Sequence, residues 1–439
     1  MKKIIYFSLT IVFLFSCKKE TNSSSTIDCG GLTDTRPNIL LIIADDMGLD
    51  ATPGYNVGTI KPNVPNIQNM INQGVRYNNF WSYPVCTPTR SSMLTGKYGF
   101  RTNILKVGDV LSTSETSLQS HIDNNTGNRY AHAVIGKWHL STSPSHPTDM
   151  GVGYYAGLLS GAAKSYSNWN FTENGATSNS TDYITTKITD LAIDWVDDQT
   201  KPWFLWLAYT APHSPFHLPP TVMHSQGALP SDSASIAANP LPYYMAMIEA
   251  MDYQIGRLLD SMSQAERDNT IIIFIGDNGT PNQVVQRYSS QRAKGSVYKG
   301  GINVPMIVSG NGVNRINETD DAFVSTVDVY ATIADLTGTG TTDINDSKSF
   351  KNTFSDQNKG TRNYIYSEVG NNSNSNTDYT IRNNTHKYIR FDDGTEALYN
   401  LSINEFENPN LMAPSRLPLS TSDSIIKAEL EAEVVRIRL

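Results

Sequence analysis

Residues 38–46 read Asn-Ile-Leu-Leu-Ile-Ile-Ala-Asp-Asp, and this stretch decides the fold of the chain. Every residue from Ile39 to Ala44 is apolar, without the alternation of a strand that has one side in water. A short apolar run of this kind is typical of a strand buried on both faces of a parallel sheet. Two carboxylates follow directly. The stretch therefore predicts a central strand whose carboxyl end opens on a functional crevice.

Outward from this strand, the chain alternates between buried strands and amphipathic helices. Further strands are predicted at residues 131–135, 203–209 and 271–275. Helices are predicted from Pro65 to the stop signal Gly74, from a capping residue Asp182 through Trp195, and from Tyr244 to Met262. This alternation predicts an α/β domain over residues 35–340, with a mostly parallel central sheet flanked by helices.

The C-terminal part of the chain has a different texture. Beyond Thr339 it is rich in Asn, Ser and Asp, with short β-like runs at 363–368, 379–382 and 387–391. Asp392-Asp393-Gly394 is typical of a hairpin turn. We predict a smaller antiparallel α+β subdomain over residues 341–439.

The N-terminal residues are predicted to be a targeting segment. Lys2-Lys3 precede the apolar stretch 4–15, and Leu14-Phe15-Ser16-Cys17 resembles a bacterial lipobox. We expect a lipoprotein signal peptide over 1–17, lipidation of Cys17 and a flexible tether over 18–34. Ordinary signal cleavage, with Cys17 incidental, is the alternative. Under both alternatives we expect export, to the periplasm or the cell surface of a bacterium. If Cys17 is lipidated, this lipid is the only part of the protein expected in the membrane.

Composition narrows the classes of partner. The formal net charge is −8, no Lys/Arg-rich block occurs, and no apolar run is long enough to span a membrane. Nucleic acid is therefore not expected as a partner. An anionic substrate has to be met by a local cationic pocket. The chain has three cysteines, and Cys29 in the predicted tether is expected to be a free thiol.

A rare pentapeptide, Cys86-Thr87-Pro88-Thr89-Arg90, follows the first predicted helix. Given the composition, roughly 0.005 matches to Cys-x-Pro-x-Arg are expected by chance. A structural alternative is a buried cysteine before a proline turn, with an arginine paired to a carboxylate. The pentapeptide thus marks a candidate site.

Two pairs of oxygen-bearing side chains stand directly after predicted buried strands. These are Asp45-Asp46 and Asp277-Asn278. Since carboxyl ends of parallel strands share one edge of a sheet, the two pairs can meet there. Carboxylate and amide oxygens suit Ca²⁺ or Mg²⁺ rather than zinc.

From about Arg36 to Pro414, the chain resembles the type I, formylglycine-dependent sulfatases of the alkaline-phosphatase-like superfamily. The motifs that carry this resemblance occur in the family's order: Pro37-Asn38-Ile39 to Asp45-Asp46, Cys86 to Arg90 with Leu94-Thr95-Gly96, Gly136-Lys137-Trp138-His139-Leu140, Pro212-His213, Gly276-Asp277-Asn278-Gly279, Lys294-Gly295, Gly300-Gly301-Ile302, Val304-Pro305 and Leu398-Tyr399-Asn400-Leu401. The ordered set is far more specific than any single motif.

The resemblance implies a nucleophile made from Cys86. A dedicated maturase would oxidise the thiol to formylglycine, whose hydrate attacks sulfur and later expels sulfate as the aldehyde re-forms. The family's ion, Ca²⁺ with Mg²⁺ as the alternative, would be held by Asp45, Asp46, Cys86, Asp277 and Asn278.

The resemblance also implies roles for five cationic or basic side chains. Arg90 would hold the hydrate, Lys137 would bridge it to sulfate, and His139 would assist the expulsion of sulfate, a role for which Asp46 competes. His213 and Lys294 would contact the sulfate, and one of them, by preference His213, would protonate the leaving alcohol.

Substrate preference is less specified. The loop 160–181 carries Tyr166 and Trp169, and aromatic faces pack against sugar rings. Because an exported enzyme also meets polymers outside the cell, we expect a sulfated carbohydrate as the substrate, with these rings packed against the sugar. A small aryl sulfate is the alternative. Departures from the family at Ser141, Lys299 and Asn303 bear on the subfamily. Two rival functions stay open: phosphonate or phosphodiester hydrolysis within the same superfamily, and non-catalytic glycan binding by a lipoprotein.

Overall fold

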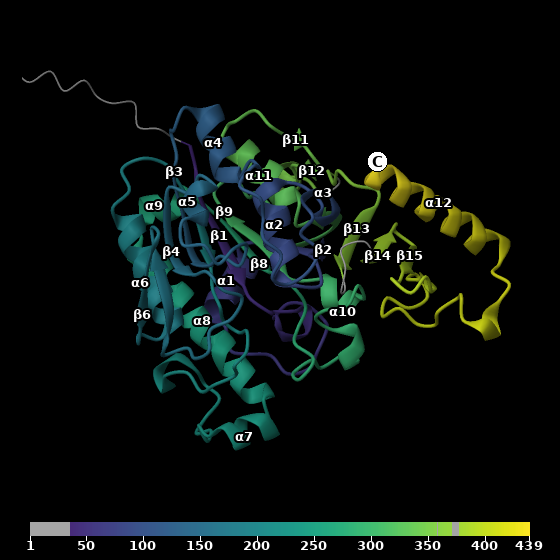
Figure 1. Cartoon of the computed structure of the whole chain (residues 1–439), viewed down its shortest axis with the longest axis horizontal. Coiled ribbons are helices and arrows are strands. Elements are labelled where there is room, and N and C mark those ends of the chain that lie inside the picture. The colour runs from purple at the N-terminus through teal and green to yellow at the C-terminus, as the bar shows by residue number, and fades with distance from the viewer. Residues whose placement is uncertain (1–35, 358, 371–376) are drawn as a thin grey trace, which may run out of the picture. The chain divides into compact units, whose positions relative to one another are not determined.

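A β-sheet flanked by helices forms the centre of the protein (Figure 1). It has ten strands in the order β10-β2-β9-β8-β1-β7-β3-β4-β5-β6. The computed structural model describes residues 36–357, 359–370 and 377–439. The strands are β1 (Asn38–Ala44), β2 (Gly74–Trp81), β3 (Ala131–Lys137), β4 (Tyr154–Leu158), β5 (Trp169–Glu173), β6 (Ala176–Ser180), β7 (Trp203–Ala208), β8 (Thr270–Gly276), β9 (Met306–Gly310) and β10 (Glu318–Ser325). The stretch 38–44 is the central strand β1, parallel to β7 on one side and to β8 on the other.

Helices cover both faces of this sheet. Successive side chains of β1 point to opposite faces, so β1 contributes to the core on each side. Ile39, Leu41 and Ile43 pack in one core, and Leu40, Ile42 and Ala44 in the other. The first face carries α2 (Cys86–Thr95), α4 (Leu118–Thr126) and α11 (Asp328–Leu336). The second carries α1 (Pro65–Asn72), α6 (Ile184–Asp197) and α8 (Leu241–Ser261). Double coverage explains why β1 is apolar from Ile39 to Ala44. The predicted mostly parallel α/β fold is confirmed.

A second sheet follows near the C-terminus. It is antiparallel, in the order β13 (Ile365–Gly370), β14 (Thr377–Arg382), β15 (His386–Arg390) and β16 (Glu396–Asn400). The long helix α12 (Thr421–Arg438) packs on it through Leu430, Val434 and Ile437. Asp392-Asp393-Gly394 lies between β15 and β16, as predicted. The antiparallel C-terminal subdomain is confirmed as a fold feature. Its boundary at residue 341 stays a prediction.

Short helices connect the main elements. They are α3 (Gly99–Thr102), α5 (His146–Asp149), α7 (Ser233–Ala238), α9 (Gln264–Asp268) and α10 (Lys299–Ile302), and the remaining strands β11 (Asp343–Ile344) and β12 (Ser347–Lys348) pair with each other.

Two local predictions are wrong. Asp182 does not cap α6: Tyr183 occupies the capping position and no side chain caps it. The segment 160–181 is also not a plain loop, because β5 and β6 form a hairpin through Asn174-Gly175 that extends the edge of the sheet. Both turn residues have positive φ, 43° for Asn174 and 88° for Gly175, as this tight turn requires.

Within the described residues, no helix combines the length and the apolar character needed to cross a membrane. The predicted signal peptide, the lipobox Cys17, the tether and Cys29 lie outside the described residues. They stay predictions.

Candidate active site

The two oxygen-bearing pairs meet at the carboxyl ends of adjacent strands. Ala44 of β1 pairs with Gly276 of β8, so Asp45-Asp46 and Asp277-Asn278 leave the sheet side by side. The backbone N–H of Asp46 donates to Asp277 Oδ1 at 3.0 Å, and Asn278 Nδ2 donates to Asp46 Oδ1 at 2.7 Å. All four residues are buried. Asp46 has a φ of 73°, in the left-handed region that costs most residues energy, and such strain is often kept at functional positions.

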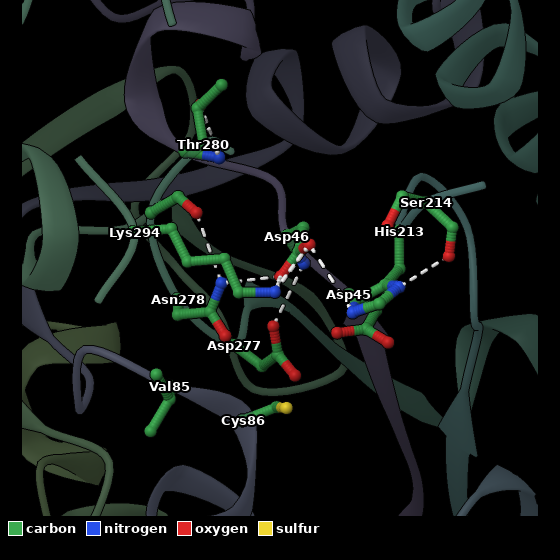
Figure 2. Close-up of polar contacts among 12 residues, drawn as sticks. Asp45, Asp46, Val85, Cys86, His213, Ser214, Asp277, Asn278, Thr280 and Lys294 are labelled. Carbon is green, nitrogen blue, oxygen red and sulfur yellow. Dashed lines mark hydrogen bonds and ion pairs between the residues drawn. The ribbon is translucent and has the colours of Figure 1, made fainter. Parts of the chain in front are cut away.

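Cys86 is the first residue of helix α2 and lies beside these carboxylates (Figure 2). It is 2 % exposed, and its Sγ lies 3.1 Å from His139 Nδ1. Val85 caps the helix without a side-chain hydrogen bond, so the backbone N–H groups of the first turn and the helix dipole favour negative charge at Cys86. Burial nevertheless raises the pKa of the thiol, with Lys137 opposing this effect. An unmodified thiol here is protonated at neutral pH and is a poor nucleophile.

The side chains of Arg90 and Lys137 have no exposed surface. Arg90 comes four residues after Cys86, on the same side of α2; its Nη2 lies 2.8 Å from Asp277 Oδ2, and its Nη1 donates to the Lys137 carbonyl at 2.8 Å. Lys137 Nζ lies 2.5 Å from Asp45 Oδ2. Buried charges are costly unless paired, so each cation fixes one carboxylate.

The carboxylates differ in their electrostatics. Burial tends to raise the pKa of Asp45, but Lys137 and the neighbouring cations outweigh burial and hold this pKa below its usual range. Burial and the charge of Asp45 raise the pKa of Asp277 to about 7. Two carboxylates so close in a buried site repel each other, and a cation between them would relieve the repulsion.

His139 is held tightly against the nucleophile position. Its backbone φ is 57°, and Thr87 Oγ1 lies 3.4 Å from Nδ1 and 3.3 Å from Nε2. A Cβ atom at Gly161 would come within 2.3 Å of Nε2, so a larger residue there would force the His139 ring to move. Burial, together with the charges of Lys137 and Arg90, lowers the pKa of His139 to about 2. The imidazole is therefore neutral and can accept a hydrogen bond.

His213 and Lys294 approach Asp46 from opposite sides, as Figure 2 shows. Lys294 Nζ lies 2.5 Å from Asp46 Oδ1 and 2.7 Å from Oδ2. His213 Nε2 is 3.7 Å from Asp46 Oδ2, while Nδ1 lies 2.7 Å from the Ser214 carbonyl, which fixes the proton on Nδ1. Their side chains are 14 % and 21 % exposed. The other predicted site residues are buried, so His213 and Lys294 mark the solvent side of the site.

The aromatic residues expected to stack on a sugar do not do so. Tyr166 and Trp169 are each 3 % exposed. Trp169 Nε1 donates to the Asp182 carbonyl at 2.9 Å. Tyr166 Oη donates to the carbonyls of Thr210 and His213, at 2.9 and 2.7 Å. That prediction is wrong, because both rings fill the core beneath the hairpin.

Tyr166 is instead a positioning residue that sequence reasoning missed. We expect Tyr166→Phe to lower kcat about tenfold with little change in KM, because the segment carrying His213 loses its anchor while the substrate contacts remain. Steady-state kinetics on a sulfate ester measure this split. Tyr183→Phe is the matched control: Tyr183 Oη lies 3.0 Å from His217 Nε2, and among the described residues it forms no hydrogen bond with His213. Equal losses in both variants would contradict the positioning role.

Thr87, Gly161 and Tyr244, whose hydroxyl donates to the Asp46 carbonyl at 2.8 Å, also support the site. Thr87 lies inside the rare pentapeptide. The other two carry no sequence signal of their own, because only the folded chain brings them to the site.

The donor set fits a hard divalent cation. Asp45 Oδ1 and Asn278 Oδ1 are buried and have no hydrogen-bond partner among the described residues. Unpaired buried oxygens are costly, and oxygen ligands are those that Ca²⁺ and Mg²⁺ prefer. Ligand atoms of Asp45, Cys86 and Asp277 lie within 4.8 Å of one another, as do those of Asp45, Asp46 and His213. The structure thus brings together the full predicted set of site residues; their roles stay predictions.

Comparison with known proteins identifies the family. A family model described as Sulfatase matches residues 37–339, well over half of the chain. The chain belongs to the sulfatase family. An arylsulfatase of Klebsiella aerogenes is 25 % identical over a match covering 69 % of this chain and 87 % of that protein. Arylsulfatase G of Rattus norvegicus is also 25 % identical, and the match covers 69 % of this chain but only 65 % of that longer protein.

Solved structures show that this sulfatase family member has the expected alkaline-phosphatase-like fold. Ps i-CgsB in complex with k-i-k-neocarrahexaose superposes with a TM-score of 0.77 at 23 % identity, covering 91 % of this chain and 92 % of that one. A protein in complex with its substrate D-glucosamine-2-N,6-O-disulfate gives 0.74 at 19 %, covering 92 % and 98 %. The phosphonate monoester hydrolase of Agrobacterium radiobacter gives 0.69 at 18 %, covering 92 % and 95 %. The predicted enzyme class, sulfuric ester hydrolase, is confirmed at the level of the family.

Proposed function

We propose that this protein hydrolyses sulfate esters of a carbohydrate with a nucleophile formed from Cys86. One observation carries the proposal: the buried Cys86 begins a helix beside Asp45 and Asp277, in a site where two ligand oxygens have no hydrogen-bond partner among the described residues. A carbohydrate is supported by a similar protein whose bound substrate is a glucosamine disulfate. The buried Tyr166 and Trp169 lend no support to it.

Two groups would complete the site. A formylglycine made by a maturase from Cys86 would supply a hydrated aldehyde, whose hydroxyl is the attacking oxygen. A Ca²⁺ ion, or Mg²⁺ as the alternative, held by Asp45, Asp46, Asp277, Asn278 and the modified residue 86, would supply Lewis-acid polarisation.

The side chains of this protein divide the remaining work. Arg90 and Lys137, fixed by their buried ion pairs, orient residue 86 and present positive charge to the sulfate oxygens. The neutral His139, 3.1 Å from Sγ, accepts a hydrogen bond from residue 86 and so assists the deprotonation that expels sulfate. Asp46 is bound by Lys294 and Asn278, which leaves it less free for that role.

In this proposal the imidazolium form of His213, which carries a proton on Nε2 as well as on Nδ1, donates the Nε2 proton to the leaving oxygen. Its Nε2 lies on the solvent side of the site and is beyond hydrogen-bond distance of Asp46. Lys294 Nζ is already bound to both oxygens of that carboxylate. Lys294 therefore serves as a fixed positive charge for the sulfate.

Purified protein should be assayed on an aryl sulfate, on the phosphodiester with the same aryl leaving group, and on defined sulfated oligosaccharides. We expect turnover of the sulfate ester to exceed that of the phosphodiester and desulfated sugars to appear. The likeness to a phosphonate monoester hydrolase makes the phosphodiester the sharpest comparison. Faster phosphodiester turnover would sink the sulfatase proposal in favour of that activity.

Removal of the metal is expected to abolish turnover and lower Tm. The buried oxygens of Asp45 and Asn278 would then lack partners, and a ligand at about 100 times its Kd contributes roughly 2.7 kcal/mol to the free energy of unfolding. Dialysis against a chelator followed by Ca²⁺, Mg²⁺ or Zn²⁺, with Tm and activity measured at each step, checks this.

The variant Asn278→Leu, which removes one ligand oxygen at similar volume, should lose most of the Ca²⁺-dependent rise in Tm. Restoration by Zn²⁺ but not by Ca²⁺ or Mg²⁺ would contradict the assignment of a hard cation.

A further inference from the structure

A second polar cavity lies where the central sheet meets the C-terminal sheet, and it shares no lining residue with the candidate active site. Its volume is about 500 Å³. Residues from β2, the bulge in β10, the end of β14 and the loop after β16 line it, among them Arg76, Asn79, Asn303 and Arg382. We call it the Arg76–Arg382 pocket.

Arg76 has an unusual environment for a guanidinium group. It is half-buried, its Nε is buried without a hydrogen-bond partner, and among the described residues it has no ion pair. Its guanidinium carbon lies 5.2 Å from the centre of the Tyr55 ring, which supports it from one side. An arginine stays charged in proteins, so this side chain offers hydrogen-bond donors that the fold itself does not use.

Arg382 is similar. Nη1 donates to Asn79 Oδ1 at 3.2 Å and Nε to the Asn383 carbonyl at 3.0 Å, and Phe323 lies beneath the group at 5.0 Å. All hydrogen-bond partners of Arg382 are neutral. Burial lowers the pKa of Arg382 to about 10, although the charges of nearby carboxylates act to raise it. A guanidinium without a carboxylate partner is stabilised by an anion.

The other charged residues that line the pocket do not neutralise the positive charge of Arg76 and Arg382. Lys299 and Glu405 pair with each other. Asp321 accepts a hydrogen bond from Asn78 Nδ2 at 2.8 Å, and of the described residues it is the only other carboxylate that lines the pocket. Two unpaired arginines thus face one carboxylate, within a chain whose net charge is −8.

Asn303 adds an acceptor. It is 3 % exposed, and its Nδ2 donates to the Asn78 carbonyl at 3.1 Å. Its Oδ1 is buried and has no hydrogen-bond partner in the part of the chain that the structure describes. A free sulfate ion offers no donor for this oxygen, whereas a sugar hydroxyl does. The donors and the acceptor together fit an anionic group on a hydroxyl-bearing ring.

We propose that the Arg76–Arg382 pocket binds an acidic sugar residue, a sulfated or carboxylated ring of a polysaccharide, away from the sulfate that is cleaved. This inference deepens the proposed function by naming a second contact for a polymeric substrate, and it rests on that function only for the chemical class of the polymer. Binding itself is independent of turnover.

The test measures binding of dextran sulfate, polygalacturonate and neutral dextran to the full chain, with Arg76→Gln and Arg382→Gln as the variants. Arg129→Gln is the matched control, since Arg129 is an exposed arginine outside the pocket and its loss changes the net charge equally. Arg76→Gln removes no hydrogen bond or ion pair among the described residues, so the fold should be retained; Tm checks this.

We expect each pocket variant to weaken binding of at least one acidic polysaccharide about tenfold, while the control and kcat/KM for a small aryl sulfate stay unchanged. Dextran sulfate and polygalacturonate distinguish a sulfate from a carboxylate ligand. Unchanged affinity in both pocket variants, or an equal loss in Arg129→Gln, would overturn the proposal. So would displacement of the polymer by inorganic sulfate at the same concentration of sulfate groups.

The two proposals fail in different ways. If the wild-type protein hydrolyses no sulfate ester, the proposed function is wrong, and the binding difference between pocket and control variants is still measurable. If hydrolysis occurs but the pocket variants bind like the control, only the second site is wrong.

Discussion

Replacing Cys86 with alanine is expected to abolish hydrolysis of sulfate esters and to leave the fold intact. The attacking oxygen is proposed to originate at this residue, and loss of a catalytic nucleophile costs about 10⁴-fold or more in kcat. The side chain makes one polar contact, the 3.1 Å approach to His139, so truncation should cost about 1 kcal/mol in the free energy of unfolding. Kinetics on an aryl sulfate and Tm measure the two effects.

Cys29→Ala is the matched control, because it removes another thiol and should keep full activity. Mass spectrometry of the peptide that contains residue 86 should show an aldehyde in active wild-type protein. An active Cys86→Ala variant would refute the mechanism. An unmodified thiol, persisting after co-expression with a maturase, would favour the glycan-binding alternative.

His213→Ala is expected to slow hydrolysis of a carbohydrate sulfate about 10³-fold, but that of an aryl sulfate with an acidic phenol only about tenfold. A sugar alkoxide is a poor leaving group that needs a proton, whereas such a phenolate departs without one. Parallel kinetics on the two substrates measure the difference. The solvent-side position of Nε2 motivates this prediction.

Lys294→Ala is the matched control. It removes a neighbouring side chain that also contacts Asp46 but is proposed to act as a fixed charge, so its losses should be similar on both substrates. The reverse pattern, with the leaving-group dependence in Lys294→Ala, would assign the proton donor to Lys294 instead.

The sequence predicted those parts of the fold that local patterns specify. β1 and β8 are short apolar runs with one interpretation in an α/β chain, and α8 keeps its helical period over five turns, so these elements lie where expected. The cap of α6 was missed by one residue, because periodicity locates a helix but not its first turn. The β5–β6 hairpin did carry a signal, the dipeptide Asn174-Gly175, within a segment whose polar composition suggested a loop.

The site was predicted as a set of residues rather than as a geometry. The order of motifs named Cys86, Lys137 and Asp277, but nothing in the sequence indicates that Arg90 pairs with Asp277, a residue 187 positions away. Nor does it reveal that Gly161 is confined by the His139 ring. Such contacts depend on how several elements pack, and packing is specified only by the whole chain.

The burial of helix α2 limits the time for which the Cys86 thiol is accessible to an enzyme while the protein is made and folds. All residues of the helix are buried, and its partners are translated much later: Asp277 lies 187 residues after Arg90, and Thr326 lies 234 residues after Ser92. At about 5–20 residues per second, the segment around Cys86 waits roughly 10–50 s after its synthesis for those partners to be made. An enzyme that oxidises this thiol would have to act within that interval. Chains in which α2 is buried before the oxidation would accumulate as stable but inactive molecules.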